Sequence, residues 1–357
     1  MNTLAWIGFS QSLFAAMLMF SKKDNSLPDR ILSGWLTLLS IEFLTCGIDH
    51  EVFGESLLSS SFLLFNPALY LYISSLTRPA FRLKWIQLLH LFPFIVFEIM
   101  AYIVLEPFAI DKFFVRDENF IFRMIFATAN FISWLIYNPL SLVLVHKHRI
   151  FLQNEQSNIE KNDNLGWVLS VSIFYVVYCI FAVILAVIVF FAALNPQIPH
   201  IYNYAVLLFL IYNLSFYGLR QKIPLTQFSD EIESNKHSNL SDETKELIKQ
   251  KILLYFDKER AYLRPELNMD LLSSHLKIPK YHITEVLNAD IGMNFFRFVN
   301  SYRVEAVKQM LNDPSIKYSI EAIGYECGFS SKSAFYTVFK DITGGTPVAY
   351  RKASQNS

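Results

Sequence analysis

The first 222 residues contain seven largely apolar stretches, each close to the length of a helix that crosses a lipid bilayer. Crossing a hydrocarbon core of ~30 Å takes about 20 apolar residues in a helix, because unpaired backbone polar groups are costly in lipid. Only 28 of these 222 residues are charged, against 34 of the remaining 135, which argues against a single soluble globule. The pattern predicts seven transmembrane helices over residues 3–20, 31–48, 57–76, 85–105, 120–145, 166–194 and 203–219.

Lys and Arg side chains are unevenly distributed between alternate loops of this region. Eleven fall in three alternate loops and in the segment that follows residue 219, whereas the opposite loops hold two, Lys112 and Arg116. Basic residues concentrate on the cytoplasmic side of membrane proteins. The bias therefore predicts an N-terminus outside and residues 220 onward in the cytoplasm, which agrees with an odd number of spans. The first stretch does not resemble a signal peptide, because Lys22 and Lys23 follow it instead of preceding it.

Two acidic residues, Glu42 and Glu98, lie inside predicted spans. Ionisable groups in lipid are expensive and commonly face a cavity or a partner, so both are candidates for a membrane-embedded signal or proton site. Hydrogen bonding between helices, or a position nearer the interface, is the alternative. The cysteines Cys46, Cys179 and Cys327 are far apart and read as small buried residues. No metal site or cofactor is expected.

The chain becomes polar after the last span. Residues 223–240 have no apolar period and read as a linker, and residues 241–357 as a second domain. Ser241 is a good N-cap for a helix whose first turn holds Asp242 and Glu243. The apolar stripe of that helix indicates internal packing, with a homodimer seam as the alternative.

Residues 268–292 and 319–344 form an internal repeat. Asn268 corresponds to Ser319 as an N-cap, and Gly292 corresponds to Gly344 at the end of each unit. Each unit reads as a short helix, a tight turn and a second helix, which is the helix-turn-helix pattern. Gly328 supplies the second turn, and Ser331 can cap the helix after it.

An apolar helix over residues 295–311 joins the two units. Two recognition helices held about one duplex turn apart, ~34 Å, can enter successive major grooves from one face of DNA. One helix-turn-helix match is a weak signal, but two matched units joined by an apolar helix are much stronger.

At these residues the sequence resembles the DNA-binding domain of AraC/XylS-type transcription regulators. Arg303 and Ala306 of the linking helix carry the resemblance, as do Gly328-Phe329, Phe335 and Phe339-Lys340, and Pro347 with Tyr350-Arg351. The whole chain resembles the bacterial subgroup in which seven membrane spans precede that domain. Gly324 stands where Ala is usual and is expected to cost about 1 kcal/mol of helix stability. Pro279 replaces a common Ser cap, which a first helical turn tolerates.

The early positions of each recognition helix are expected to face DNA bases. Such side chains can donate to or accept from base edges in the major groove, although a solvated Glu285 is an equal alternative. Lys340 is a candidate phosphate neighbour. Residues 241–357 hold 16 basic and 14 acidic residues, so binding must depend on local placement and on pairing between copies. The predicted DNA-binding residues are Lys332, Ser333, Tyr336, Thr337 and Lys340 in the second unit, with Tyr281, Thr284, Glu285, Lys280 and His282 in the first.

The sequence thus predicts an all-α chain, with a seven-helix transmembrane domain followed by a cytoplasmic AraC-type domain. The predicted function is a membrane-embedded, non-enzymatic transcription regulator in the bacterial inner membrane. Its expected partners are double-stranded DNA, the lipid bilayer and a small-molecule or envelope signal, with a homodimer left open. The alternative is a transporter or channel with a helical cytoplasmic interaction module, for which Glu42 and Glu98 are the support.

Overall fold

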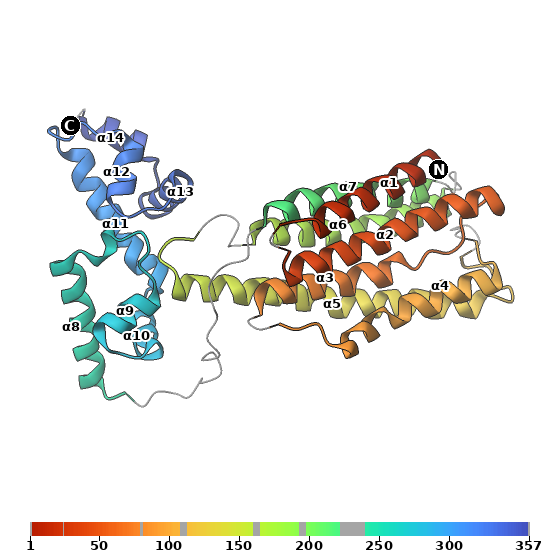
Figure 1. Cartoon of the computed structure of the whole chain (residues 1–357), viewed down its shortest axis with the longest axis horizontal. Coiled ribbons are helices and arrows are strands. Elements are labelled where there is room, and N and C mark those ends of the chain that lie inside the picture. Colours follow the sequence, from red (N-terminus) through yellow and green to blue (C-terminus); the bar gives the residue numbers. More distant parts are fainter. Residues whose placement is uncertain are drawn as a thin grey trace. The chain divides into compact units, whose positions relative to one another are not determined.

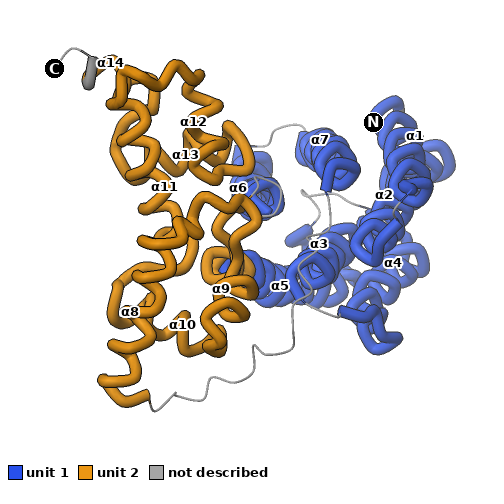
Figure 2. Tube along the Cα trace, turned by 60° about the vertical axis from the view of Figure 1, so that its left-hand side comes forward, with its two compact units in different colours: residues 1–146, 165–230 blue, residues 147–164, 231–357 orange. Residues whose placement is uncertain are grey.

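A computed structural model describes residues 2–23, 25–78, 81–107, 113–159, 165–192, 198–221 and 240–355. Their regular secondary structure is helical, apart from two isolated β-bridges, which confirms the predicted all-α class. The chain divides into two compact units, residues 1–146 with 165–230 and residues 147–164 with 231–357 (Figure 2). Apart from Leu240, the predicted linker lies outside the described residues.

Unit 1 is a bundle of apolar helices (Figure 1). Its main core joins residues of α1, α2, α3, α5, α6 and α7. A smaller cluster joins α4 and the first part of α5 near the start of α3. The helices are α1 (Asn2–Phe20), α2 (Leu27–Val52), α3 (Ser61–Thr77), α4 (Phe92–Val104, preceded by the 3₁₀ helix Trp85–Leu91), α5 (Phe120–Glu155), α6 (Gly166–Phe191) and α7 (Ile198–Arg220).

Within the described residues, six helical segments, not the predicted seven, are long and apolar enough to cross a membrane by themselves. The exception is α3, whose 17 residues extend about 25 Å at 1.5 Å per residue. The prediction began this span at residue 57, but Leu57 forms a bridge with Pro107, and the helix begins only at Ser61. Most of α3 is buried among the other helices, so its length is set by packing as well as by hydropathy.

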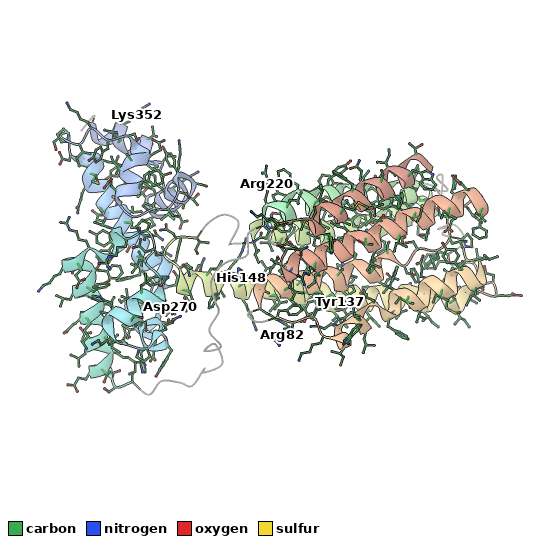
Figure 3. All side chains as sticks on the ribbon, in the orientation of Figure 1. Arg82, Tyr137, His148, Arg220, Asp270 and Lys352 are labelled. Atoms are coloured by element: carbon green, nitrogen blue, oxygen red, sulfur yellow. The ribbon has the colours of Figure 1, made fainter. Side chains whose placement is uncertain are left out.

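One end of the bundle brings together the end of α1, the start of α2 and the end of α7. The Lys22 ammonium lies 2.8 Å from the Asp29 carboxylate and donates to the Gln221 carbonyl at 2.9 Å. The Trp167 indole, at the start of α6, donates to the Gln221 side chain at 2.8 Å. Arg82 and Arg220 lie at this same end (Figure 3).

The opposite end joins the end of α2 to the end of α4. The Tyr102 hydroxyl donates to Asp49 at 2.8 Å, and the Leu58 N–H donates to the Glu106 carbonyl at 2.8 Å. The Arg123 guanidinium, in the first turn of α5, pairs with Glu106 at 2.8 Å. Consecutive helices therefore run in alternate directions through the bundle, α3 included (Figure 1).

Helix α5 continues ten residues beyond its predicted end at residue 145 and stops at Glu155. The residues after 146 belong to the second compact unit, where Leu152 and Ser157 are buried. Apolar periodicity could not reveal this, because the extension is short and mixed in polarity.

Unit 2 contains two small cores that share one helix, α11 (Phe295–Asn312). Phe295, Phe298 and Val299 belong to the first core, and Val304, Val307 and Leu311 to the second. The helix was predicted from its apolar residues, but its buried surface also includes the polar side chains of Asn300 and Arg303. The other helices are α8 (Asp242–Glu259), α9 (Met269–Leu276), α10 (Lys280–Val286), α12 (Ile320–Glu326), α13 (Lys332–Thr343) and α14 (Pro347–Gln355), with short helical turns at Ala261–Leu263 and Leu287–Ile291.

Four helix caps are those that the sequence predicts, whereas Asn294, which caps α11 through the Arg297 N–H, was not predicted. Ser241, Asn268, Ser319 and Ser331 each accept a backbone N–H from three residues further along the chain. These contacts satisfy amides that have no partner within the helix. The stripe of α8 is mainly internal: Ile248, Ile252, Tyr255 and Phe256 are buried, whereas Leu247 is exposed.

Candidate nucleic-acid interface

The second helix-turn-helix unit consists of α12, a turn and the recognition helix α13. Gly328 makes the turn with φ +89°, and a Cβ atom there would lie 2.5 Å from the Tyr262 carbonyl oxygen. Phe329, Phe335 and Phe339 are buried and hold α13 against α11 and α12. The motif residues thus determine the angle of the recognition helix.

Gly324 has a packing reason for its departure from the usual Ala. A Cβ atom there would lie 2.6 Å from Cδ1 of Phe335, so a larger residue would displace that ring. The corresponding position of the first unit is Ser273, and the corresponding ring position is Ile283. The cost in helix propensity is therefore accompanied by room for a larger aromatic side chain.

The predicted base-facing residues of α13 lie on its outer side. Lys332, Ser333, Thr337 and Lys340 are exposed, and Tyr336 is half-buried. Ser331 caps the helix through the Ala334 N–H at 3.2 Å, so its N-terminal end is ordered. A recognition helix presents this end to the major groove.

Glu321 of α12 orients two of these side chains. The Lys332 ammonium lies 2.7 Å from its carboxylate, and the Tyr336 hydroxyl donates to it at 3.3 Å. The hydrogen bond from Lys332 lowers the pKa of Glu321, and the same contact raises the pKa of Lys332. Lys332 is still 61% exposed, so the pair leaves it accessible.

The first unit consists of α9, a turn at Lys277 and the recognition helix α10. Lys277 adopts the left-handed conformation with φ +56°, where the second unit has a glycine at φ +89°. Pro279 precedes α10 and makes no side-chain cap. This recognition helix has seven residues before it widens into the turn at 287–291, whereas α13 has twelve.

The predicted DNA-binding residues of α10 differ in their surroundings. Tyr281 is exposed and its ring contacts that of His282 at 4.0 Å, and Thr284 is half-buried. Glu285 pairs with Lys245 of α8 at 3.0 Å. Glu285 is therefore held by an ion pair, which neither the predicted base contact nor the solvated alternative had anticipated.

Lys280 lies between two carboxylates at the start of α10. Its ammonium is 2.5 Å from Asp270 and 3.1 Å from Glu155, the last residue of α5 (Asp270 is labelled in Figure 3). Burial opposes the charge, but these contacts outweigh it and raise the pKa of Lys280. Residues 155–158, which we call the α5 tail, were missed by sequence reasoning, because nothing in a polar loop signals a distant partner.

Arg303, a motif residue of the linking helix, is fully buried. Its guanidinium donates to the carbonyls of Tyr262 at 2.8 Å, Arg264 at 3.0 Å and Ser157 at 3.0 Å. Burial lowers its pKa to about 10. Arg303 therefore pairs inside this compact unit, and one of its acceptors belongs to a residue of the α5 tail.

Glu42 and Glu98 come together in unit 1 although they are far apart in sequence. The Ser59 hydroxyl donates to the Glu42 carboxylate, and the Ser60 N–H donates to that of Glu98 at 3.1 Å. Another acid, the buried Asp49, accepts from the Tyr102 hydroxyl and from the Leu57 N–H. Asp49 follows directly after the predicted span 31–48 and lies in the last turn of α2.

Comparison with known proteins agrees with this geometry. A family described as "Helix-turn-helix domain" matches residues 272–353. The regulatory protein PocR of Salmonella typhimurium is 30% identical over 103 residues, which cover 29% of this chain and 32% of that protein. An uncharacterized HTH-type transcriptional regulator of Staphylococcus aureus is 29% identical over 95 residues, covering 27% of this chain and 12% of that protein.

A solved structure, that of a protein of unknown function from Listeria innocua, is 26% identical and covers 30% of this chain and 96% of that chain. Its TM-score of 0.27 is too low to support an argument about the fold. The chain spans about a third or less of the length of these two curated relatives. The family match lies in its C-terminal part.

The class of the C-terminal domain follows from the duplicated motif, its geometry and these matches. It is a helix-turn-helix domain, a class of DNA-binding module rather than of enzyme. More particularly, it is of the AraC type, with two helix-turn-helix units joined by one shared helix.

Proposed function

We propose that this protein is a membrane-embedded one-component transcription regulator. The cytoplasmic AraC-type domain binds promoter DNA by inserting α10 and α13 into successive major grooves. The observation that carries this proposal is the shared helix α11, whose two ends lie in separate cores and so join two recognition helices in one domain. The exposed Lys332, Ser333 and Thr337 provide donors and acceptors for base edges.

The membrane part of the proposal rests on unit 1. Six apolar helices have spanning length, and α3 runs through the bundle largely shielded by the others. Its buried Tyr72 packs against Trp167 at 6.1 Å between ring centroids, while residues just before its start contact the end of α4. We therefore propose that all seven helices cross the bilayer, with the short α3 in the interior.

The proposed orientation places the N-terminus outside and the DNA-binding domain in the cytoplasm of a bacterial cell. The basic residues of alternate loops support it, since Lys22, Arg82 and Arg220 lie at one end of the bundle. Accessibility of single introduced cysteines to a membrane-impermeant thiol reagent in intact cells tests this topology. Labelling from outside at residue 82 would contradict it.

Selection from a random pool of duplexes of about 40 base pairs tests DNA recognition by the full chain in lipid nanodiscs. We expect enrichment of a site that contacts two successive major grooves. Binding to that site should weaken in Lys332→Ala and in Tyr336→Phe, which removes only the hydroxyl. Failure to enrich any sequence with a correctly folded protein would refute the proposal.

The signal is proposed to act on unit 1, with Glu42 and Glu98 as the candidate responsive groups. Their shared position beside Ser59 and Ser60 is the supporting observation, and a small-molecule or envelope signal is the partner class. The same acids support the rival function, a transporter or channel. Solute flux in proteoliposomes that disappears in Glu98→Gln, without any DNA selection, would favour the rival.

A further inference from the structure

Helix α5 carries the α5 tail, residues 155–158, into the DNA-binding domain. Ser157 is fully buried there, and Gln156 forms an isolated bridge with Asn268. Asn158 donates to the carbonyls of Pro265 at 2.8 Å and Gly328 at 3.0 Å. A segment between the fifth and sixth apolar helices is thus part of the compact unit that contains both recognition helices.

The site that receives Ser157 is built from buried polar groups of α11. Arg303 donates to the Ser157 carbonyl through Nη1 and to its hydroxyl through Nη2, both at 3.0 Å. Asn300, 1% exposed, donates to the same carbonyl at 2.9 Å. Among the described residues, no carboxylate lies within ion-pair distance of Arg303, so its buried charge depends on neutral oxygens, two of them from Ser157. A buried donor without a partner is costly, so this site specifies a polar occupant.

The α5 tail contacts the beginning of both recognition helices. Glu155 pairs with Lys280, the first residue of α10, at 3.1 Å. Asn158 holds the turn before α13 through the Gly328 carbonyl and through the Ser330 N–H at 3.4 Å. The N-terminal part of a recognition helix is the part that contacts base edges and phosphates in the groove.

We propose that the α5 tail is an internal competitor of DNA, which occupies the side of the domain that a duplex must approach. This inference rests on the proposed DNA-binding function. Glu155 takes the position at Lys280 that a DNA phosphate takes when the domain is bound. Asn158 connects the tail to the second helix-turn-helix unit. Since α5 begins at Phe120 among the apolar helices, a displacement of that helix removes or restores the competitor.

A reversible cross-link tests the competition in the full chain. Asn158→Cys with Ser330→Cys in nanodiscs should form a disulfide that retains the tail, with peptide mass spectrometry to locate it. Burial raises the pKa of Cys327 to about 12, so this native thiol reacts poorly with the two introduced cysteines at neutral pH. The probe is a labelled duplex of about 40 base pairs, taken from the random-pool selection.

We expect the oxidised protein to bind this duplex at least about tenfold more weakly than the reduced protein, because a cross-linked competitor cannot be displaced. The single variant Asn158→Cys, treated identically, should show no dependence on reductant. Equal binding by the cross-linked and reduced forms would overturn the inference. Failure of the two cysteines to cross-link would overturn it as well, because the tail would then not be docked.

Release of the tail should have the opposite effect. Asn158→Ala removes its contacts with Pro265, Gly328 and Ser330. It leaves the two Ser157 oxygens on Arg303, so the domain should remain folded. We expect at least about threefold tighter DNA binding, since a tethered competitor acts at high effective concentration. The matched control is Ile150→Ala, an exposed position on the same helix, which should leave affinity unchanged.

The two proposals fail in distinguishable ways. If wild type, reduced double variant and Asn158→Ala all bind no selected duplex, the DNA-binding function itself is wrong, and the competition falls with it. If they bind equally well whether or not the tail is retained, DNA binding stands and only the competition is wrong.

Discussion

The two helix-turn-helix units of this protein have the same plan but different details. In the second, Gly324 and Phe335 make a small-and-large pair, and Ser331 caps a recognition helix of twelve residues. In the first, Ser273 and Ile283 take the matching positions, and the Ser273 hydroxyl donates to the Ile278 carbonyl at 2.6 Å. The first recognition helix has seven α-helical residues, continues as the wider turn Leu287–Ile291, and has no side-chain cap.

We propose that this difference reflects a division of labour between the two helix-turn-helix units. The second unit is ordered by its own motif and leaves Lys332 and Ser333 exposed. The first unit has its leading lysine, Lys280, paired with Glu155 of the α5 tail. In this proposal, recognition helix α13 stays accessible to DNA, while recognition helix α10 is controlled by the α5 tail.

The turn glycine of the second unit should give the largest effect. Gly328→Ala combines a left-handed backbone with a Cβ that meets the Tyr262 carbonyl at 2.5 Å, so we expect a loss of about 3 kcal/mol of domain stability. Hydrogen exchange of α12 and α13 in the full chain measures it. The matched control is Gly344→Ala, with φ +78° and open space around the Cβ, which should cost only about 1 kcal/mol. Equal losses would show that the close approach is unimportant.

A double-mutant cycle should show energetic coupling between Gly324 and Phe335. Gly324→Ala should destabilise the second unit by about 2 kcal/mol, against the gain that helix propensity alone predicts, because the added methyl meets the Phe335 ring. With Phe335→Ile, which reproduces the first unit, the same change should cost far less. Additive effects in hydrogen exchange would contradict the packing explanation.

The leading lysines of the two recognition helices should differ in their effect on DNA affinity. Lys332→Ala should weaken binding of the selected duplex about tenfold, or 1.4 kcal/mol, at fixed salt. Lys280→Ala should change the DNA affinity less than about threefold. The substitution removes a DNA contact, but it also removes the ion pair with Glu155 that competes with that contact. Fluorescence anisotropy measures both, and Lys352→Ala on α14 controls for the loss of one charge. A larger effect at Lys280 would reverse the proposed division of labour.

The helix caps should account for a smaller part of the difference in stability between the two recognition helices. Ser331→Ala removes the bond to the Ala334 N–H and should cost about 1 kcal/mol. Pro279→Ser offers the first unit the cap that it lacks, and should stabilise α10 by less than that because the unfolded chain regains freedom. Hydrogen exchange near the start of each helix distinguishes the two outcomes, and no change at Ser331 would show that the cap is dispensable.

The smallest expected effect concerns pH. The Lys332 pair lowers the pKa of Glu321, so its contribution is present at neutral pH and is lost as the pH falls through that lowered pKa. Because both groups are exposed to solvent, the change in stability should be small. A ¹³C-NMR titration of the Glu321 carboxyl should give a midpoint below that of Glu321 in Lys332→Ala. Identical midpoints would show that the pair does not persist in solution.

The sequence by itself determined the local features of this protein. Apolar runs predicted where the helices of unit 1 lie, and the repeat predicted both helix-turn-helix units. Caps such as Asn268, Ser319 and Ser331 were predictable because a capping side chain and its amide partner are three residues apart. The length of α3 was not, because the residues before it pair with the distant end of α4 instead of continuing the helix.

Only the tertiary structure decided which distant residues meet. Ser157 and Arg303 are 146 positions apart, and no periodicity in either segment depends on the other. The burial of α11 between two cores, the room that Gly324 gives Phe335, and the meeting of Glu42 with Glu98 have the same origin. Local propensity acts over a few residues, whereas these arrangements follow from the packing of whole helices, where the cost of a buried, unpartnered polar group selects one pairing.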